Sequence, residues 1–281
     1  MCEFCVKHGE GKKWYLQAKN YSEDLLSDLR RREFIAEFFA HPESLEKDAR
    51  QLERLDQVPS FVRRVVTWRV SNSMKKTHYG QVVPVEDLEH IFDFVNSIVR
   101  VACICRYATL GSEQRYCYGV SMASDGGQLG QIIREIDISY LTGPDTVGLE
   151  ALGKDEALAA LREHEREGLC HTLWTFVTPF IGGICNCDRS DCLAMRSTVT
   201  HATPVMFRAE YVGEVDSDLC NGCRACMRLC QFGAIGHSAA LKKATIDPRR
   251  CYGCGICRSV CPNDAIVLRD RSAVPAAANI W

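Results

Sequence analysis

Eight cysteines near the C-terminal end of this 281-residue chain fall into two runs with the same spacing. The runs are Cys220, Cys223, Cys226 and Cys230, and Cys251, Cys254, Cys257 and Cys261. Both follow the pattern C-x2-C-x2-C-x3-C, and each is closed by Ala-Ile a few residues later, so the segment is an internal repeat. Three thiolates at this spacing can wrap three corners of a cubane iron–sulfur cluster. The pattern therefore predicts two 4Fe-4S clusters.

The fourth cysteine of each run points away from its own turn and reaches the cluster of the other run. We therefore expect cluster 1 to be held by Cys220, Cys223, Cys226 and Cys261, and cluster 2 by Cys251, Cys254, Cys257 and Cys230. Glycines in the turns, such as Gly222 and Gly253, adopt positive φ without penalty and let backbone N–H groups approach sulfur. Zinc is the alternative, but a zinc site needs four ligands and has no use for the repeated fourth cysteine.

Residues 211–270 resemble bacterial two-cluster ferredoxins, including the dipeptide Cys261-Pro262. One departure is Gln231, which follows Cys230 where a proline is common. The resemblance implies a small electron-transfer domain in this part of the chain.

Six further cysteines form two triplets upstream of this region. They are Cys103, Cys105 and Cys117, and Cys185, Cys187 and Cys192. Each triplet begins with C-x-C and follows an expected strand, where loops present side chains from a fixed scaffold. We hypothesise a third iron–sulfur centre that uses chiefly the second triplet, with at least one ligand from the first. The alternatives are ordinary buried thiols, a zinc site, or a redox-active pair closed within a C-x-C segment.

The N-terminus carries a C-x2-C-x2-H pattern formed by Cys2, Cys5 and His8. These residues are three potential metal ligands, and a fourth would have to come from elsewhere, for example from Cys170 or a partner subunit. The alternative is that they bind no metal.

Apolar periodicity and capping residues predict the scaffold that positions these cysteines. Helices are expected from Tyr21 to Phe39, Pro42 to Asp56, Ser60 to Ser73, Glu86 to Ile98, Gln128 to Ile136 and Lys154 to Glu167. Strands are expected from Val99 to Cys105, Tyr116 to Met122 and Leu169 to Val177. The fold class is therefore α+β, with an α-rich domain over residues 1–210, the two-cluster ferredoxin-type domain over 211–270, and a tail over 271–281.

Composition narrows the classes of function. A net charge of −2 provides no basic field for nucleic acid or an anionic membrane, and no apolar run predicts a membrane span. An odd count of 17 cysteines argues against a fully paired disulfide framework and favours metal ligation. The N-terminus does not have the pattern of a signal peptide, so we expect a cytoplasmic protein.

Segments outside the ferredoxin region also resemble a loose family of iron–sulfur proteins of anaerobes. The matching segments are Cys103 to Arg106, Leu161 to His171, and Cys185 to Leu193, so the resemblance covers most of residues 85–270. It implies an electron-transfer subunit that relays single electrons to or from a flavoprotein or another iron–sulfur subunit in a hetero-oligomeric complex. Two alternatives stay open: a redox enzyme that reduces a substrate at the additional centre, and an iron–sulfur sensor.

Overall fold

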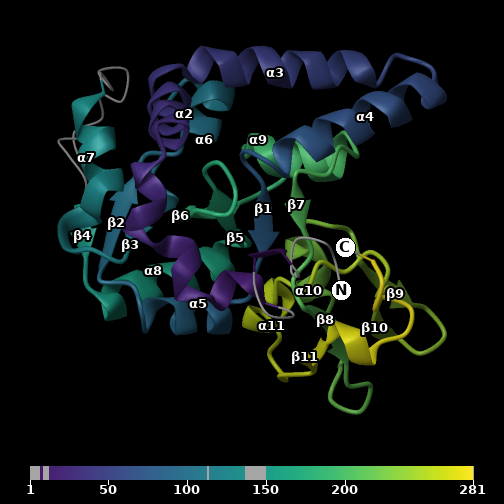
Figure 1. The fold of residues 1–281 in the computed structure, drawn as a ribbon. Coiled ribbons are helices and arrows are strands. Elements are labelled where there is room, and N and C mark those ends of the chain that lie inside the picture. Colours follow the sequence, from purple (N-terminus) through teal and green to yellow (C-terminus); the bar gives the residue numbers. More distant parts are fainter. Residues whose placement is uncertain (1–6, 9–12, 113, 137–149, 281) are drawn as a thin grey trace.

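A seven-stranded sheet forms the centre of the N-terminal part of the computed structural model, which describes residues 7–8, 13–112, 114–136 and 150–280 (Figure 1). Its strands are β1 (Gly80–Val82), β2 (Ser97–Val101), β3 (Cys117–Ser121), β4 (Glu150–Leu152), β5 (Cys170–Thr175), β6 (Ile181–Cys187) and β7 (Met206–Phe207). The strand order is β4-β2-β3-β6-β5-β1-β7. Neighbouring strands are antiparallel, except that β1 and β7 are parallel.

One face of this sheet packs against two helices, α5 (Val85–Phe92) and α8 (Lys154–Glu167). Leu88 of α5 and Leu161 of α8 share a fully buried core with Leu173 and Ile184 of the sheet. Such burial is the main force that fixes an amphipathic helix on a sheet. Gly168 ends α8 in the left-handed conformation, with φ of 90°, and β5 begins two residues later.

The other face of the sheet is covered by helices from several parts of the chain. These are α2 (Leu29–Ala40), α3 (Pro42–Leu55), α4 (Ser60–Met74), α6 (Ile104–Leu110), α7 (Gly127–Glu135) and α9 (Leu193–Met195). Figure 1 shows α3 and α4 as two long helices joined by a loop, lying along one side of the molecule. Phe39 of α2 and Ile133 of α7 pack with Phe176 in a second apolar core on this face.

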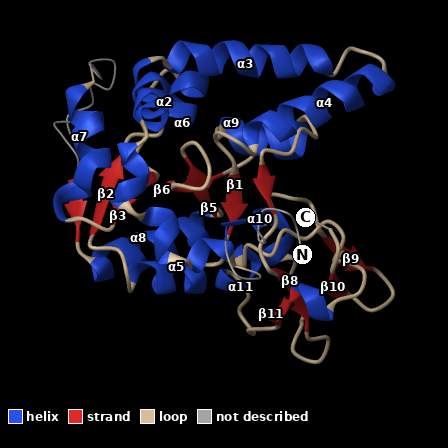
Figure 2. Cartoon of the chain, in the orientation of Figure 1, coloured by secondary structure: helices blue, strands red, loops and turns tan. Residues whose placement is uncertain are grey.

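The C-terminal part repeats one unit twice, as the cysteine spacing predicts. Its elements are β8 (Tyr211–Val215), α10 (Ala225–Leu229), β9 (Ile235–Ser238), β10 (Lys243–Ile246), α11 (Ile256–Ser259) and β11 (Ile266–Asp270). β8 pairs with β11 and β9 with β10, both antiparallel, so this part contains two small two-stranded sheets (Figure 2). The third cysteine of each repeat lies in a short helix, Cys226 in α10 and Cys257 in α11.

Hydrogen bonds tie the C-terminal part to the end of α8. The Gln231 side chain donates to the carbonyl oxygen of Gly168 at 2.7 Å and accepts from the backbone of Arg189 at 3.0 Å. The Ser259 hydroxyl is 3.3 Å from the carbonyl oxygen of Glu165. The departure from the ferredoxin pattern at Gln231 therefore has a structural role, because this side chain joins both parts of the chain.

Three expected elements are wrong in their extent. The segment after Tyr21 forms 3-10 turns, capped by Ser22, and the α-helix begins only after Asp28 caps it at Leu29. The helix α5 ends at Phe92, six residues earlier than expected. The strand expected from Val99 to Cys105 ends at Val101, and Cys103 instead starts α6. Within the described residues, no helix combines the length and apolarity that crossing a membrane requires.

Candidate iron–sulfur site

Backbone N–H groups point at the sulfurs of the C-terminal cysteines. The N–H groups of Gly213 and Gly253 donate to the sulfur of Cys251, at 3.3 and 3.4 Å. The other contacts of this kind are Ala234 to Cys230 at 3.2 Å, Ala265 to Cys261 at 3.2 Å and Ala244 to Cys220 at 3.5 Å. Hydrogen bonds from backbone amides to cysteine sulfur are one of the means by which proteins set the potential of a bound iron–sulfur cluster. The donor set therefore fits such clusters.

Thiols from the two sequence runs lie close to one another in the C-terminal part. The pKa of Cys226 is raised by burial and by the neighbouring charges of Cys223, Cys261 and Cys220. The pKa of Cys257 is raised well above its ordinary value by burial and then by Cys254, Cys251, Cys230 and Cys226. Charge acts on a pKa through proximity, so thiols of the two runs are neighbours. Cys257 also packs with Cys220, Cys226 and Cys261 in one apolar cluster, and the assignment of ligands to each cluster stays a prediction.

Two glycines are needed for these turns. Gly222 and Gly253 both have φ of 71°. A Cβ atom at Gly222 would lie 2.0 Å from the carbonyl oxygen of Lys242, and one at Gly253 would lie 2.1 Å from that of Tyr211. Any side chain would therefore collide with backbone and push the turn away from the sulfurs.

The register of the large sheet places four other thiols on one face. Cys185 and Cys187 alternate along β6, and residues two apart in a strand point to the same side. Cys117 of β3 lies directly opposite Cys185, and Cys170 of β5 lies directly opposite Cys187. Directly opposed residues share a face, so all four side chains lie on the face away from α5 and α8.

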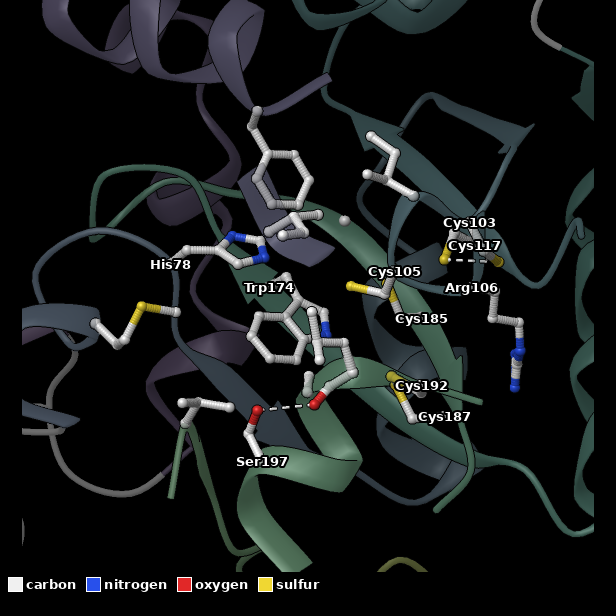
Figure 3. A pocket seen from close by; sticks show the side chains of 18 of the residues that line it. His78, Cys103, Cys105, Arg106, Cys117, Trp174, Cys185, Cys187, Cys192 and Ser197 are labelled. Carbon is white, nitrogen blue, oxygen red and sulfur yellow. Dashed lines mark hydrogen bonds between the residues drawn. The ribbon is translucent and has the colours of Figure 1, made fainter. Parts of the chain in front are cut away.

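Two helix starts complete this group. Cys103 precedes α6, which contains Cys105, and Cys192 precedes α9. Six sulfurs then line one cavity of about 540 Å³ (Figure 3), and we call them the upstream thiol site: Cys103, Cys105, Cys117, Cys185, Cys187 and Cys192. The two triplets expected from the sequence are thus brought together in one place.

The contacts within the upstream thiol site run between segments. The sulfurs of Cys103 and Cys117 are 3.0 Å apart, and those of Cys187 and Cys192 are 3.1 Å apart. A disulfide bond measures about 2.05 Å, so these are free thiols in contact. Neither close pair is formed within a C-x-C segment. The contacts that the structure shows are therefore not those of the disulfide alternative considered from the sequence.

Charge in the upstream thiol site is concentrated at Cys192 and Arg106. Hydrogen bonds with Cys105 and Cys187 lower the pKa of Cys192 well below its ordinary value, so this sulfur is the one most readily present as thiolate. The buried guanidinium of Arg106 donates to the carbonyl oxygen of Asn186 at 3.2 Å and forms an ion pair with Asp188. A buried, ion-paired guanidinium therefore lies beside the sulfurs.

Cys170 connects the two groups of thiols. It is fully buried, lies opposite Cys187 in the sheet, and packs in one apolar core with Cys254 of the C-terminal part; its S–H group also lies 3.7 Å from the carbonyl oxygen of His171. The neighbouring thiol of Cys170 lowers the pKa of Cys254. A single residue thus touches a candidate ligand of cluster 2 and neighbours the upstream thiol site.

The N-terminal motif is only partly described. Cys2 and Cys5 lie outside the described residues, whereas His8 is half-buried with its ring 6.2 Å from that of Trp14. Burial, together with the charge of Lys7, lowers the pKa of His8 to about 4. Among the residues that the structure describes, no three His, Cys, Asp or Glu side chains converge as the ligands of a single metal ion would.

The sequence did not indicate the role of Arg271, which falls in the segment expected to be a tail. This side chain is fully buried and donates to the carbonyl oxygens of Ala209, Tyr211 and Cys251, at 2.7, 2.8 and 2.9 Å. Burial lowers its pKa to about 10. It holds the strand β8 to the turn of Cys251, and no local pattern around a lone arginine could have revealed that.

Comparison with known proteins supports the iron–sulfur interpretation of the C-terminal part. Residues 219–265 match the family model of the 4Fe-4S dicluster domain. Indolepyruvate oxidoreductase subunit IorA of Pyrococcus abyssi is 44% identical over 52 residues, which are 18% of this chain and 8% of that subunit. Archaeal-type glutamate synthase (NADPH) of Thermotoga maritima is 35% identical over 60 residues, or 21% of this chain and 12% of that enzyme. A subunit of the ion-translocating oxidoreductase complex of Methanosarcina acetivorans is 44% identical over 50 residues, which are 18% of each protein.

The matches define a class of protein and no more. The chain spans less than a fifth of the length of these relatives, and each match covers about a fifth of this chain. The chain carries a ferredoxin-like iron–sulfur domain near its C-terminus, and its relatives are oxidoreductases or subunits of them. The ferredoxin-like domain and these relatives support an iron–sulfur electron-transfer role for the C-terminal part.

Proposed function

We propose that this chain is the electron-transfer subunit of a cytoplasmic redox complex and relays single electrons through three iron–sulfur centres. Two are the 4Fe-4S clusters of the C-terminal part, with the ligands assigned above. The third is an additional centre at the upstream thiol site, held chiefly by Cys185, Cys187 and Cys192 with at least one ligand from the other triplet. The partner is a flavoprotein or another iron–sulfur subunit, as the relatives are oxidoreductase subunits.

The observation that carries this proposal is the position of Cys170. Its contact with Cys254 on one side and its pairing with Cys187 on the other link the two groups of thiols through one residue. Both groups also contribute to one apolar core, which includes Cys192 and Cys230. Redox centres placed at each end of this contact would lie close enough to form one chain of electron carriers.

The order of the carriers follows from the same contacts. The charge of Cys226, a candidate ligand of cluster 1, acts on Cys257 of cluster 2, so these two clusters would be neighbours. Cluster 2 would in turn face Cys170 and the additional centre. Electrons would pass between cluster 1 and the additional centre by way of cluster 2, with a direction set by potentials that span roughly −700 to +450 mV among such clusters.

The test is the content of iron and acid-labile sulfide in anaerobically purified protein, with electron paramagnetic resonance of the reduced form. Three cubane centres give about twelve of each per chain, and two give about eight. A Cys185→Ser, Cys187→Ser double variant should lose about four irons and one signal, while Cys223→Ser should lose cluster 1 and keep the additional centre. A value near eight in the unmodified protein, unchanged in the double variant, would contradict the additional centre.

A further inference from the structure

The cavity that contains the upstream thiol site extends far beyond the sulfurs. Its volume of about 540 Å³ lies within the range of small-molecule sites, roughly 300–1,000 Å³. The sulfurs occupy one end, and the wall at the other end is made by apolar side chains of α3 and α4, among them Leu52, Leu55, Val66 and Val70. A bound iron–sulfur centre would fill only the sulfur end. An apolar chamber would remain next to it.

Aromatic rings form the middle of this cavity, as Figure 3 shows for His78 and Trp174. The ring of His78 stacks on that of Trp174, with centroids 4.6 Å apart and an angle of 25° between the planes. Phe38 and Phe176 approach the same imidazole, at 4.5 and 5.3 Å. Rings in such arrangements offer faces and edges on which another flat ring packs well.

His78 supplies one polar group of known character. Its Nδ1 lies 2.7 Å from the carbonyl oxygen of Thr175, which can only accept, so Nδ1 carries the proton. Burial lowers the pKa of His78 to about 4, and the ring is therefore neutral at physiological pH. A neutral imidazole protonated at Nδ1 presents Nε2 as a hydrogen-bond acceptor.

The cavity offers little compensation for a charged ligand. Among the residues that the structure describes, no aspartate or glutamate lines it. Of its two arginines, Arg106 is already paired with Asp188, whereas Arg54 is exposed on α3 at the outer end. Moving an ion into apolar surroundings without a partner costs far more than moving a neutral molecule. A neutral ring therefore fits the inner cavity better than an anion does.

From this arrangement we propose that the cavity binds a small, uncharged aromatic molecule whose single hydroxyl or N–H group donates a hydrogen bond to Nε2 of His78. The molecule lies between the ring of His78 and the apolar wall of α4, next to the upstream thiol site. The inference deepens the proposed function. It rests on that function only for the additional centre, which would lie beside the ligand.

The probe is 1-naphthol, with 1-methoxynaphthalene as the analogue that cannot donate and 1-naphthoate as the charged analogue. Binding to the anaerobic holoprotein is measured by isothermal titration calorimetry. We expect one 1-naphthol per chain, bound roughly three- to tenfold more tightly than 1-methoxynaphthalene, which is the worth of one hydrogen bond. Tighter binding of 1-naphthoate than of 1-naphthol would overturn the assignment of an uncharged ligand.

Three variants locate the site. His78→Phe keeps a ring in place but removes the acceptor, so it should weaken 1-naphthol to the level of 1-methoxynaphthalene and leave the latter unchanged. Val70→Trp fills the cavity and should abolish binding of both probes. Val65→Trp is the matched control, because Val65 is exposed on the same helix and does not line the cavity. The site would be overturned if Val65→Trp and Val70→Trp changed probe binding equally. It would also be overturned if His78→Phe weakened both probes equally.

Failure of this inference is distinguishable from failure of the proposed function. Iron content and the paramagnetic spectrum are recorded on the same samples before and after adding 1-naphthol. About twelve irons with no binding would overturn the ligand site alone. About eight irons, with binding that His78→Phe weakens as described, would support the ligand site and overturn the additional centre.

Discussion

Cys170→Ala should lower the reduction potential of cluster 2. In the native chain this buried thiol packs against Cys254, a candidate ligand of that cluster, and lowers the pKa of Cys254 as a hydrogen-bond donor to that sulfur does. Reduction adds one negative charge to the cluster and its thiolates, and a hydrogen-bond donor stabilises the more negative state more strongly. Removing the donor therefore makes the cluster harder to reduce.

The magnitude follows from the strength of such a bond. A hydrogen bond to a charged group contributes about 1.5–3 kcal/mol, and a thiol is a weak donor. If the hydrogen bond is stronger in the reduced state by about a third of that value, it stabilises the reduced state over the oxidised state by roughly 0.5–1 kcal/mol. For a one-electron couple about 1.4 kcal/mol corresponds to 59 mV, so the expected decrease is roughly 20–40 mV.

The assay is an anaerobic redox titration followed by electron paramagnetic resonance. The signal of cluster 2 is identified by its loss in Cys257→Ser. Cys170→Ser keeps a donor and should not show the decrease, and Thr172→Val, on the same face of the same strand but bonded to Cys187, should leave cluster 2 unchanged. A potential in Cys170→Ala that is equal to or higher than the native value would refute the reasoning.

Three further predictions test the support of the site. Arg106→Gln breaks a buried ion pair with Asp188, at a cost of roughly 3–5 kcal/mol, and should remove the signal of the additional centre while both C-terminal clusters remain. Gly253→Ala should lose cluster 2, as measured by iron analysis. The control is Gly111→Ala, because Gly111 has a similar φ of 66° but no described atom within 4 Å of its Cβ position. This variant should lose only about 1 kcal/mol of stability and keep every iron. Burial raises the pKa of Glu165 to about 7, so the stability that its neutral form contributes is fully present below pH 4.5. Roughly 3 kcal/mol of that stability is lost as pH rises through 7. The decrease in melting temperature between pH 5 and 8.5 should therefore be smaller in Glu165→Gln, and an unchanged decrease would contradict this.

The helices that could be predicted are those whose ends are marked by local chemistry. Pro42 starts α3 and Gly168 ends α8, and both helices lie within one residue of the expected bounds. The seven-stranded sheet could not be predicted, because its strand pairings join distant segments. Two of its strands have three residues, and β7 has two, so they are too short to show a period.

The same distinction holds for the candidate site. The eight C-terminal cysteines are recognisable because their geometry is set within one turn, where spacing alone carries the information. That the two upstream triplets meet was expected only as a hypothesis, and their meeting depends on the register that places Cys117 opposite Cys185. Cys170 and Arg271 act through the tertiary contacts described above. A single residue forms no spacing pattern, so its role could not be predicted from the sequence.

Buried thiols that serve only as packing need no charge around them, since a free cysteine packs as a small apolar group. The upstream thiol site is different. Contacts with Cys105 and Cys187 lower the pKa of Cys192, and the guanidinium of Arg106 is buried beside these sulfurs in an ion pair with Asp188. Thiolate is the form of cysteine that ligates iron. The lowered pKa of Cys192, more than the number of sulfurs, therefore supports the proposed redox centre over packing.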